Sequence, residues 1–295
     1  MKNKQMMDNK KVWFITGASK GFGLSLVKQL LEAGERVAAT SRNLQELTTA
    51  VGCHSQRFLP LQVNLVQESS VSLALQHTFE TFGKIDVVIN NAGYGIGGAI
   101  EELTDAETRQ AFDVNVFATL NVIRFVMPYM RKQRSGHIIN IASIAGIAPG
   151  VGWAVYGAAK YAVIGLSEVL HADVKSLGIK VTVVAPGAFR TNFLAPDSLA
   201  LTSNPIEDYE EVRFSHHKYL KMDGEQAGDP YKAASSIISI VSEENPPLYL
   251  LLGGDAYNRA LTKLDALYEE INQWKEVTCA TDFEDKVLLK QSFNN

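Results

Sequence analysis

Tyr156 and Lys160 are the two residues whose types and spacing most directly suggest chemistry. They stand four residues apart in "YGAAK", within a helical pattern, so both side chains lie on one face of the predicted helix, about 6 Å apart along its axis. A tyrosine hydroxyl can donate or accept a proton, and a nearby ammonium favours its phenolate form. Such a pair is common and is usually structural, so other residues have to decide between catalysis and packing.

Glycines crowd the stretch "TGASKGFG", residues 16–23, near the start of the chain. The apolar run "KVWFI" precedes it, and the helical pattern "LSLVKQLLEAG" follows it. A strand, a glycine turn and a helix start place backbone N–H groups and the positive end of the helix dipole where a pyrophosphate could bind. The spacing G-x-x-x-G-x-G differs from the usual dinucleotide fingerprint G-x-G-x-x-G, so an ordinary tight turn remains an alternative for this stretch alone.

Further motifs decide between these alternatives. "NNAG" occupies residues 90–93, Asn115 lies in the helical pattern "FDVNVFATLNV", Ser143 ends the strand pattern "HIINIAS", and "VAPGAFRTNF" follows the tyrosine and lysine. With the glycine stretch and the Tyr-x-x-x-Lys pair, these six ordered motifs resemble those of the short-chain dehydrogenase/reductase family. The resemblance extends over about residues 11–254.

The resemblance implies a role for each of four catalytic residues. Tyr156 is expected to protonate the alkoxide formed by hydride transfer to a carbonyl, and to act as the base in the oxidative direction. Bringing a tyrosine pKa from 10 to about 7 requires roughly 4 kcal/mol, and the charge of Lys160 is expected to supply it. Lys160 is also expected to bind the nicotinamide ribose, Ser143 to polarise the substrate carbonyl, and Asn115 to hold a water that connects Lys160 to solvent.

The same resemblance implies a cofactor site built from several motifs. Asn64 stands where the family commonly has an aspartate that contacts the adenine amino group, and an amide oxygen can still accept that bond. Asn90 is expected near the adenosine ribose. The complete expected set is Gly17, Ser19, Lys20, Gly21, Phe22, Gly23, Ser41, Arg42, Asn64, Asn90, Ala92, Gly93, Tyr156, Lys160, Pro186, Gly187, Phe189 and Thr191.

The end of the second predicted strand, "AATSRN", favours NADP over NAD. An acidic residue there would bind a ribose 2′-hydroxyl and repel a 2′-phosphate, but Ser41 occupies that position. Arg42 follows it, and Lys20 provides a second cation where NADP-using relatives often have one. Two solvated surface charges, and hence an NAD-dependent enzyme, remain the alternative.

The elements that position these motifs alternate between short apolar runs and longer helical patterns. "VWFIT", "RVAAT", "RFLPLQV", "DVVINNA", "HIINIAS", "KVTVVAP" and "LYLLLG" are typical of strands. Strands that are apolar on both faces, separated by amphipathic helices, indicate a parallel sheet covered on both sides. The sequence therefore predicts one α/β domain of Rossmann type, with a doubly wound, mostly parallel sheet of about seven strands.

Four segments are expected: a polar tail (1–10), the main domain (11–254), a substrate-loop insertion without a clear strand (about 193–226), and a C-terminal amphipathic helix and tail (255–295). Capping patterns at Thr104 with Glu107, and at Asp229 with Pro230, predict helix starts. Apolar residues at helical spacing in the C-terminal segment predict that this helix docks on the body or on a partner chain. They are Ala260, Leu261, Leu264, Leu267, Ile271 and Trp274.

Composition limits the partners and the location. The 28 basic and 32 acidic residues give a net charge of −4, which offers a nucleic acid or an anionic membrane no general attraction. No signal peptide or membrane-spanning run is expected. Cys53 and Cys279 have no metal spacing and are interpreted as free thiols in a soluble, cytoplasmic protein. His216 and His217 are interpreted as surface residues without a metal or catalytic role.

The substrate is expected to be a lipophilic ketone, aldehyde or secondary alcohol. Phe193, Leu194, Phe214 and Tyr219 in the insertion predict an apolar pocket over the nicotinamide. A non-catalytic nucleotide-sensing protein on the same fold is the alternative to an enzyme. By analogy with relatives that pair through the helices carrying the catalytic asparagine and tyrosine, a homodimer or homotetramer is expected.

Overall fold

The computed structural model describes residues 10–196 and 198–283. Within them, seven strands form one wholly parallel sheet in the order β3-β2-β1-β4-β6-β7-β9. Parallel strands buried on both faces need apolar residues on both faces, and β1 and β4 are buried throughout. The predicted fold class is confirmed. The strands are β1 (Val12–Ile15), β2 (Arg36–Ser41), β3 (Phe58–Gln62), β4 (Val87–Asn90), β6 (Gly136–Ile141), β7 (Ile179–Pro186) and β9 (Tyr249–Leu252).

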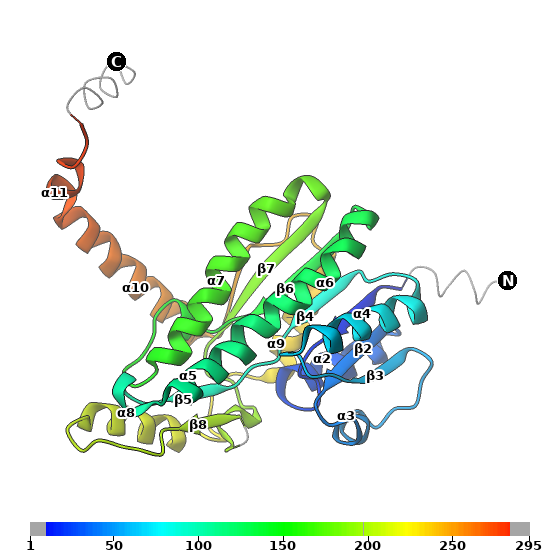
Figure 1. Cartoon of the computed structure of the whole chain (residues 1–295), viewed down its shortest axis with the longest axis horizontal. Helices are drawn as coiled ribbons and strands as arrows, with labels where there is room; N and C mark the ends of the chain where they lie inside the picture. The colour runs from blue at the N-terminus through cyan, green and yellow to red at the C-terminus, as the bar shows by residue number, and fades with distance from the viewer. Residues whose placement is uncertain (1–9, 197, 284–295) are drawn as a thin grey trace.

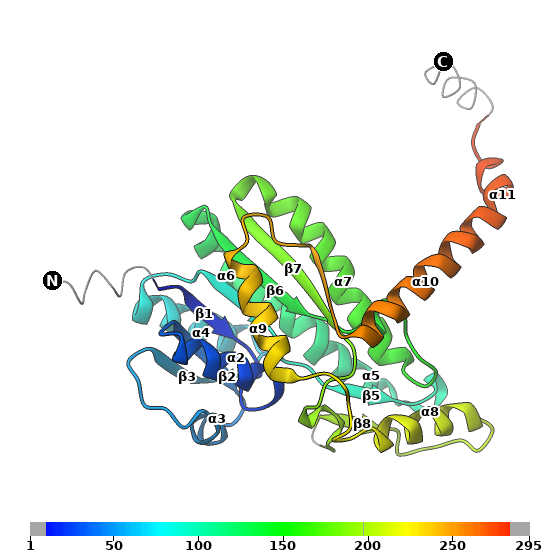
Figure 2. The ribbon, with the colours of Figure 1, turned by 180° about the vertical axis from the view of Figure 1, so that it is seen from behind.

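Helices cover both faces of the sheet. Figure 1 shows α4, α6 and α7 in front of it, and Figure 2 shows α2 and α9 in front of the opposite face. Each layer closes its own apolar core, one around Leu26 and Leu30 of α2, the other around Leu75 of α4 and Val126 of α6. The helices on the body are α2 (Gly21–Glu32), α3 (Leu44–Val51), α4 (Glu68–Phe82), α5 (Asp105–Phe112), α6 (Ala118–Gln133), α7 (Ala154–Val174), α8 (Glu210–Lys221) and α9 (Pro230–Ser239).

The strand order reverses direction between β1 and β4, because β2 and β3 extend the sheet to one side and β4, β6, β7 and β9 to the other. In open α/β sheets, ligands bind outside the carboxyl ends of the strands at such a point. The glycine stretch follows β1, "NNAG" ends and follows β4, and Ser143 follows β6. The topology therefore brings motifs far apart in sequence to one edge of the sheet.

Both predicted helix starts are confirmed. The Thr104 hydroxyl accepts from the Glu107 N–H at 3.2 Å while the Glu107 carboxylate accepts from the Thr104 N–H at 2.8 Å, a capping box that begins α5. Asp229 caps α9, with Pro230 in its first turn. These local patterns needed no tertiary information.

A long helical stretch, Asp105–Gln133, combines α5, a π-helical turn (Asp113–Phe117) and α6. It has the length and hydropathy of a membrane span, and half of its apolar window is buried inside the protein. The sequence was expected to hold no such stretch. Val122 and Val126 pack in the core beneath it, as in the core helix of a globular domain.

The insertion at about 193–226 contains a strand, contrary to the sequence-based expectation. β8 (Leu199–Leu201) pairs in parallel with β5 (Gly95–Gly97), and α8 follows it. Three residues are too few to show an alternating pattern, and the partner strand lies about a hundred positions earlier in the chain. Pairing across that separation is invisible to a local pattern.

The C-terminal helix α10 (Gly254–Gln273) leaves the body, as Figures 1 and 2 show. Ala256 and Ala260 pack against Ile144 at its base, but every residue from Leu261 to Phe283 is exposed, including the short helix α11 (Lys275–Cys279). The prediction that this helix docks on the body is wrong beyond Ala260.

Candidate active site

A cleft of about 1560 Å³ opens at the carboxyl edge of the sheet, from the glycine stretch to α8 and α10. It brings together nearly all of the expected site residues, although they come from seven separate segments. Those that line it are Gly17, Ser19, Lys20, Gly21, Phe22, Ser41, Arg42, Asn64, Ala92, Gly93, Ser143, Tyr156, Lys160, Pro186, Gly187, Phe189 and Thr191. The three expected residues outside this lining are Gly23, Asn90 and Asn115.

The glycine stretch has the geometry of a phosphate-binding loop. Gly17 has φ +64°, and a Cβ added there would lie 2.8 Å from the Ala92 Cα. A Cβ on Gly23 would lie 2.4 Å from the Gly17 carbonyl oxygen, so Gly23 serves close packing rather than contact with a ligand. Among the described residues no side chain caps the N-terminus of α2, and its first turn holds no acidic residue. Its first N–H groups and dipole can thus bind an anion.

Asn91, rather than Asn90, faces the cleft. The Asn91 side-chain amide donates to the carbonyl oxygens of Thr16 and Gly17, both at 2.9 Å, which ties the end of β4 to the glycine loop. Asn90 is buried, and its amide donates to Asn140 Oδ1 of β6 at 2.8 Å. Asn90 was expected near the ribose, but its side chain points into the sheet and Asn91 lines the cleft instead. Successive side chains at a strand end point in opposite directions.

Tyr156 and Lys160 lie where the sequence predicted, on one face of α7. The Tyr156 hydroxyl hydrogen-bonds the Ser143 side chain, and Ser143 Oγ accepts from the Ala145 N–H at 3.1 Å. Lys160 Nζ donates to the Ile141 carbonyl oxygen at 3.1 Å and lies 5.8 Å from the centre of the Tyr156 ring. The hydroxyls of Ser143 and Tyr156 and the ammonium of Lys160 therefore lie together in the wall of one cleft.

The protonation states of this pair follow from burial. Burial raises the pKa of Tyr156 to about 12, against an opposing contribution from the Ser143 hydrogen bond. Burial also lowers the pKa of Lys160 to about 8. The sequence predicted that Lys160 would lower the pKa of Tyr156 to about 7. In the structure the pKa is raised instead, because desolvation of the tyrosine is the largest effect on it. At neutral pH the tyrosine is protonated, as a general acid must be.

Asn115 supports the site from beneath it. It lies in the π-helical turn between α5 and α6 and is 1 % exposed. Its side-chain amide donates to the Ala111 and Tyr94 carbonyl oxygens at 3.0 and 3.1 Å, and its oxygen lies 3.3 Å from the Tyr94 nitrogen that donates to it. The side chain thus fixes the loop after "NNAG", and the expected role of Asn115 in holding a water stays a prediction.

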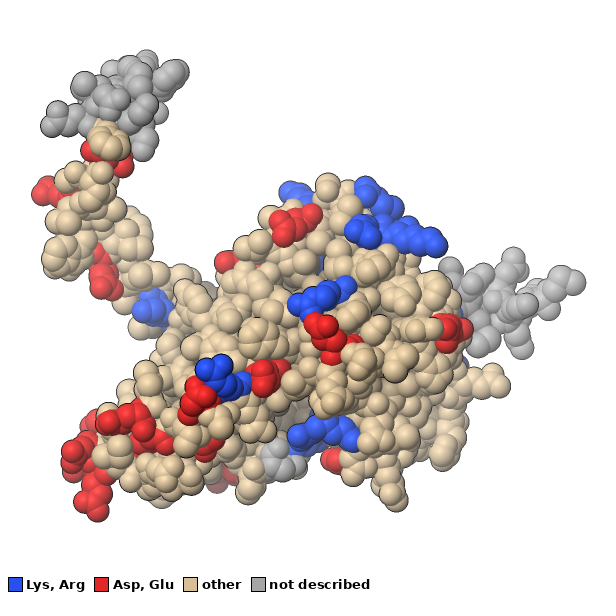
Figure 3. Space-filling view, viewed as in Figure 1, with Lys and Arg blue, Asp and Glu red and all other residues tan. Residues whose placement is uncertain are grey.

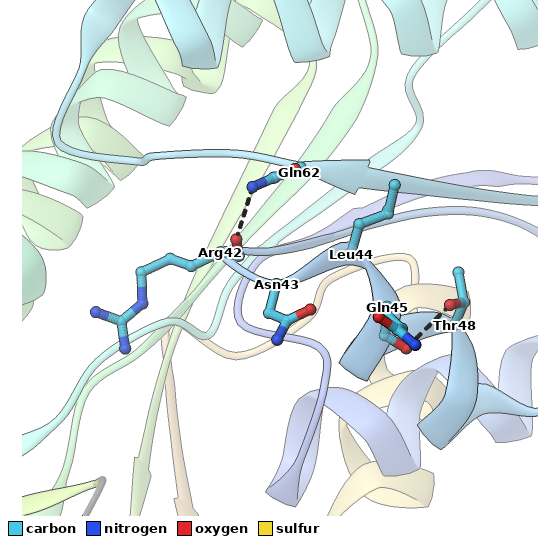
Figure 4. A pocket seen from close by; sticks show the side chains of 6 residues that line it. All are labelled: Arg42, Asn43, Leu44, Gln45, Thr48 and Gln62. Atoms are coloured by element: carbon cyan, nitrogen blue, oxygen red, sulfur yellow. Dashed lines mark hydrogen bonds between the residues drawn. The ribbon is translucent and has the colours of Figure 1, made fainter.

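Arg42 sits at the end of the cleft where β2 and β3 finish. Ser41 Oγ accepts from the Asn43 N–H at 3.1 Å, and the Gln62 amide donates to the Arg42 carbonyl oxygen at 3.1 Å. This leaves the Arg42 guanidinium extended away from its neighbours (Figure 4). A second hollow of about 650 Å³ adjoins the cleft here, sharing Arg42 and Asn43. Glu46, which the sequence reading did not single out, also lines the cleft.

Asn64 lies on the far side of the same end of the cleft. Its side-chain oxygen accepts from the Val66 N–H at 3.2 Å, within the turn that follows β3. A carboxamide oxygen has two lone pairs, so one acceptor position remains for an adenine amino group. The expected role of Asn64 is compatible with this geometry.

The opposite end of the cleft is formed by the insertion and by α10. The four expected apolar residues, Phe193, Leu194, Phe214 and Tyr219, all line it. Residues that the sequence reading missed also line it: Trp153, Lys218, Met222, Asn258, Arg259, Thr262 and Lys263. Those on α10 recur at a spacing of three and four, a polar face that a helical projection of the sequence could have revealed.

The paired histidines have different environments. His216 is buried, its ring nitrogen lies 3.0 Å from the Gly152 carbonyl oxygen, and its ring packs against Trp153 at 5.0 Å. His217 is exposed. The interpretation of both as surface residues is therefore wrong for His216, which helps hold α8 against the loop before α7.

A buried carboxylate holds the insertion in place. Glu102, in the short helix η1 (Ile100–Glu102), accepts from the Ala99 and Ile206 N–H groups at 2.7 and 2.8 Å and pairs with Arg213 of α8. Burial opposes the ionisation of Glu102, but hydrogen bonds from Ile206, Arg213 and Ala99 outweigh it and lower its pKa. The ionised carboxylate thus stabilises the native state above its ordinary pKa, and this contribution is lost as pH falls through the lowered value.

We expect Glu102→Gln to lower the free energy of unfolding at pH 7 by about 2 kcal/mol, because an amide NH₂ would face an N–H donor and Arg213 would lose its counter-ion. Urea denaturation measures the change. Glu101→Gln is the matched control, since Glu101 is exposed and accepts a hydrogen bond from the Tyr209 hydroxyl at the surface. Equal losses in the two variants would contradict the assigned role of Glu102.

Comparisons with known proteins show which family the chain is similar to. The family model described as short chain dehydrogenase matches residues 11–200. The chain is 34% identical over 273 residues to oxidoreductase BOA17 of Botryotinia fuckeliana, covering 92% of this chain and 99% of that protein. It is 37% identical over 239 residues to a 3-ketodihydrosphingosine reductase of Bacteroides thetaiotaomicron, covering 81% of this chain and 86% of that protein.

Solved structures show the same similarity. A short-chain dehydrogenase from Streptomyces avermitilis superimposes with a TM-score of 0.86 at 34% identity, over 93% of this chain and 99% of that one. The structure of ElxO with NADP bound superimposes with a TM-score of 0.70 at 26% identity, over 84% and 99% of the two chains.

Proposed function

Because the chain belongs to the short-chain dehydrogenase/reductase family, we propose that it is an NADP(H)-dependent oxidoreductase that interconverts a carbonyl and an alcohol. The position of Ser143, Tyr156 and Lys160 together in the wall of one cleft carries the proposal. An alternative as a non-catalytic nucleotide sensor is disfavoured, since both the tyrosine and the lysine are present and line the cleft.

Each residue at the centre of the cleft has its own role in the proposed reaction. A nicotinamide dinucleotide supplies the hydride when it is bound. Ser143 donates a hydrogen bond to the substrate oxygen, and the Tyr156 hydroxyl gives that oxygen its proton during reduction. Lys160 places positive charge beside the tyrosine, which stabilises the phenolate left behind. The glycine loop and the α2 N-terminus would bind the pyrophosphate.

The preference for NADP is supported by the charges at the end of β2. Ser41 carries no charge to repel a 2′-phosphate, and Arg42 extends a planar cation that can bind one in a bidentate manner. Lys20 lines the same cleft. ElxO, a relative of known structure, binds NADP. Glu46 is the opposing observation, because its carboxylate lines the cleft near this end.

A lipophilic carbonyl substrate is supported by the aromatic and aliphatic residues of the insertion. Phe193, Leu194, Phe214 and Tyr219 line the end of the cleft beyond Tyr156, where apolar surface favours an apolar ligand. The name of the Bacteroides relative, a 3-ketodihydrosphingosine reductase, is compatible with a ketone of this kind.

A panel of carbonyls and alcohols, followed by NADPH and NADH absorbance, tests the proposal. We expect aliphatic and aromatic ketones or aldehydes to be reduced with a higher kcat/KM for NADPH than for NADH. Arg42→Ala should lower kcat/KM for NADPH about tenfold or more and leave that for NADH nearly unchanged, because a charge-assisted bond to the 2′-phosphate is lost.

Lys28→Ala provides the matched control, since Lys28 is exposed on α2 and does not line the cleft. A higher kcat/KM with NADH in the wild-type protein would overturn the cofactor assignment. Turnover restricted to small charged carbonyls would overturn the substrate class.

Association into a homodimer or homotetramer is part of the proposal. Phe117 in the π-helical turn and Tyr161 and Val169 on α7 are more than half exposed. Large exposed apolar side chains on neighbouring helices are typical of interfaces, which supports pairing through these helices.

A further inference from the structure

The projecting part of α10 carries an apolar face that nothing in the described residues covers. Leu264 is 54%, Ile271 61% and Trp274 57% exposed. A single exposed apolar residue needs no explanation, but a contiguous stripe along a helix that stands in solvent is typical of an interaction surface. The continuation of the stripe adds Leu261, Leu267, Tyr268 and Val277.

The spacing of this stripe matches that of a seam between two helices. Exposed apolar residues recur at alternating steps of three and four, an average of 3.5, at Leu264, Leu267 and Ile271 of α10 and at Trp274, which directly follows the helix. This spacing is compatible with a second helix packed along the stripe.

The opposite face of α10 serves the cleft. Arg259, Thr262, Lys263 and Ala266 line it. At about 100° per residue, Thr262 and Ala266 lie on the side away from Leu264 and Ile271, and Lys263 lies at the edge of the apolar stripe. The helix thus has a polar face in the wall of the cleft and, beyond Ala260, an apolar face that the described residues leave exposed. A partner on the apolar face would leave the cleft open while holding its wall in place.

We propose that this apolar face binds the same face of α10 in a second copy of the chain, in the antiparallel direction, across a two-fold axis beside Leu267. In that register Leu264 packs against Ile271 of the second copy, and Leu267 packs against Leu267 of the second copy. Lys263 and Glu270 flank the seam on the same side of the helix. The two-fold axis places Lys263 of each chain beside Glu270 of the second copy. Apolar layers and charge pairs thus fall into register together.

The charges beside the seam favour this occupant, because the antiparallel register brings Lys263 of each chain next to Glu270 of the other. A parallel pair would instead stack Trp274 on Trp274 and bring both protein bodies to the same end of the helices. An anionic membrane surface is disfavoured, because Asp265, Glu269, Glu270 and Glu276 outnumber the basic residues along this segment, and acidic groups mark its visible face in Figure 3.

The first test measures the mass of the full-length protein by light scattering. Leu264→Glu with Ile271→Glu should weaken the association at least a hundredfold and halve the particle mass, because two carboxylates would enter the seam. Both side chains are exposed, so the fold does not depend on them. Glu269→Lys, off the seam, is the control and should leave the mass unchanged.

A charge exchange tests the register. Lys263→Glu and Glu270→Lys should each weaken the association, and the double variant should restore it, since the pair is only reversed. In a parallel pair, Lys263→Glu would have no charge partner to repel. Absence of rescue in the double variant would overturn the antiparallel arrangement.

Disulfide trapping gives an independent readout, in a background with Cys53 and Cys279 replaced by serine. Chains with Leu264→Cys mixed with chains with Ile271→Cys should form a mixed disulfide. A disulfide between two Leu264→Cys chains alone would show a parallel pair and overturn the proposed register. If no disulfide formed in any mixture, and the variant with Leu264→Glu and Ile271→Glu kept the wild-type mass, the pairing of α10 with a second copy would be overturned.

Vesicle flotation decides the remaining occupant. The proposal would be overturned if phosphatidylglycerol vesicles bound the wild-type protein but not the variant with Leu264→Glu and Ile271→Glu, while the particle mass of the variant stayed unchanged. That result would assign the apolar face to a membrane. We expect no binding to these vesicles.

Discussion

Tyr156→Phe is expected to lower kcat for carbonyl reduction by about 10³-fold while leaving the Kd for NADPH nearly unchanged. The substitution removes only the hydroxyl that hydrogen-bonds Ser143, so the proton donor is lost and the ring remains packed. General acid catalysis contributes about 10² to 10⁴ in rate, and the middle of that range is expected because the tyrosine is buried away from water. Steady-state kinetics and NADPH fluorescence titration measure the two quantities.

Tyr161→Phe is the matched control for this experiment. Tyr161 lies on the same helix, five residues further along, and is 62% exposed. Its loss should change kcat less than twofold. If Tyr156→Phe retained more than a tenth of the wild-type kcat, Tyr156 would not be the proton donor.

Lys160→Met is expected to lower kcat/KM by about 10²-fold or more. Lys160 is 4% exposed and places its ammonium 5.8 Å from the Tyr156 ring centre, where low surrounding polarity makes a charge effective. Methionine keeps most of the volume and removes the charge. Lys175→Met, at an exposed position in the same region of the chain, is the control and should retain full activity.

The pH dependence separates the charge of Lys160 from its packing. Burial lowers the pKa of Lys160 to about 8, so the side chain is charged below that pH and neutral above it. In the wild-type protein kcat/KM should therefore decline as pH rises through about 8, and in Lys160→Met this decline should disappear. A decline of equal size in the variant would assign it to another group.

Most of the cleft could be predicted from sequence, because its residues lie in short motifs at strand ends. A parallel sheet brings the carboxyl ends of its strands to one edge, so Gly17, Ser143 and Pro186 meet there whatever the loops between them do. The capping box at Thr104 was likewise predictable, because it involves only residues three apart.

The environments of individual side chains were less predictable. Asn90 and Asn91 are adjacent and chemically identical, and only the neighbouring strand, through Asn140, decides that Asn90 is buried. The pKa of Tyr156 was expected to fall and is raised instead, since desolvation depends on what covers the ring. His216 was assigned to the surface because Gly152 and Trp153, its partners, lie more than sixty positions away.

The sequence by itself determined the order of the motifs, the parallel sheet and the residues that gather at its carboxyl edge, because each depends on local pattern and on strand direction. Tertiary structure alone decided the pairing of β5 with β8, the burial of Glu102 beneath the insertion, and the path of α10 away from the body. An amphipathic stripe such as that of α10 indicates an apolar face that needs a cover, but only the arrangement in space shows that the described residues of its own chain leave it exposed beyond Ala260.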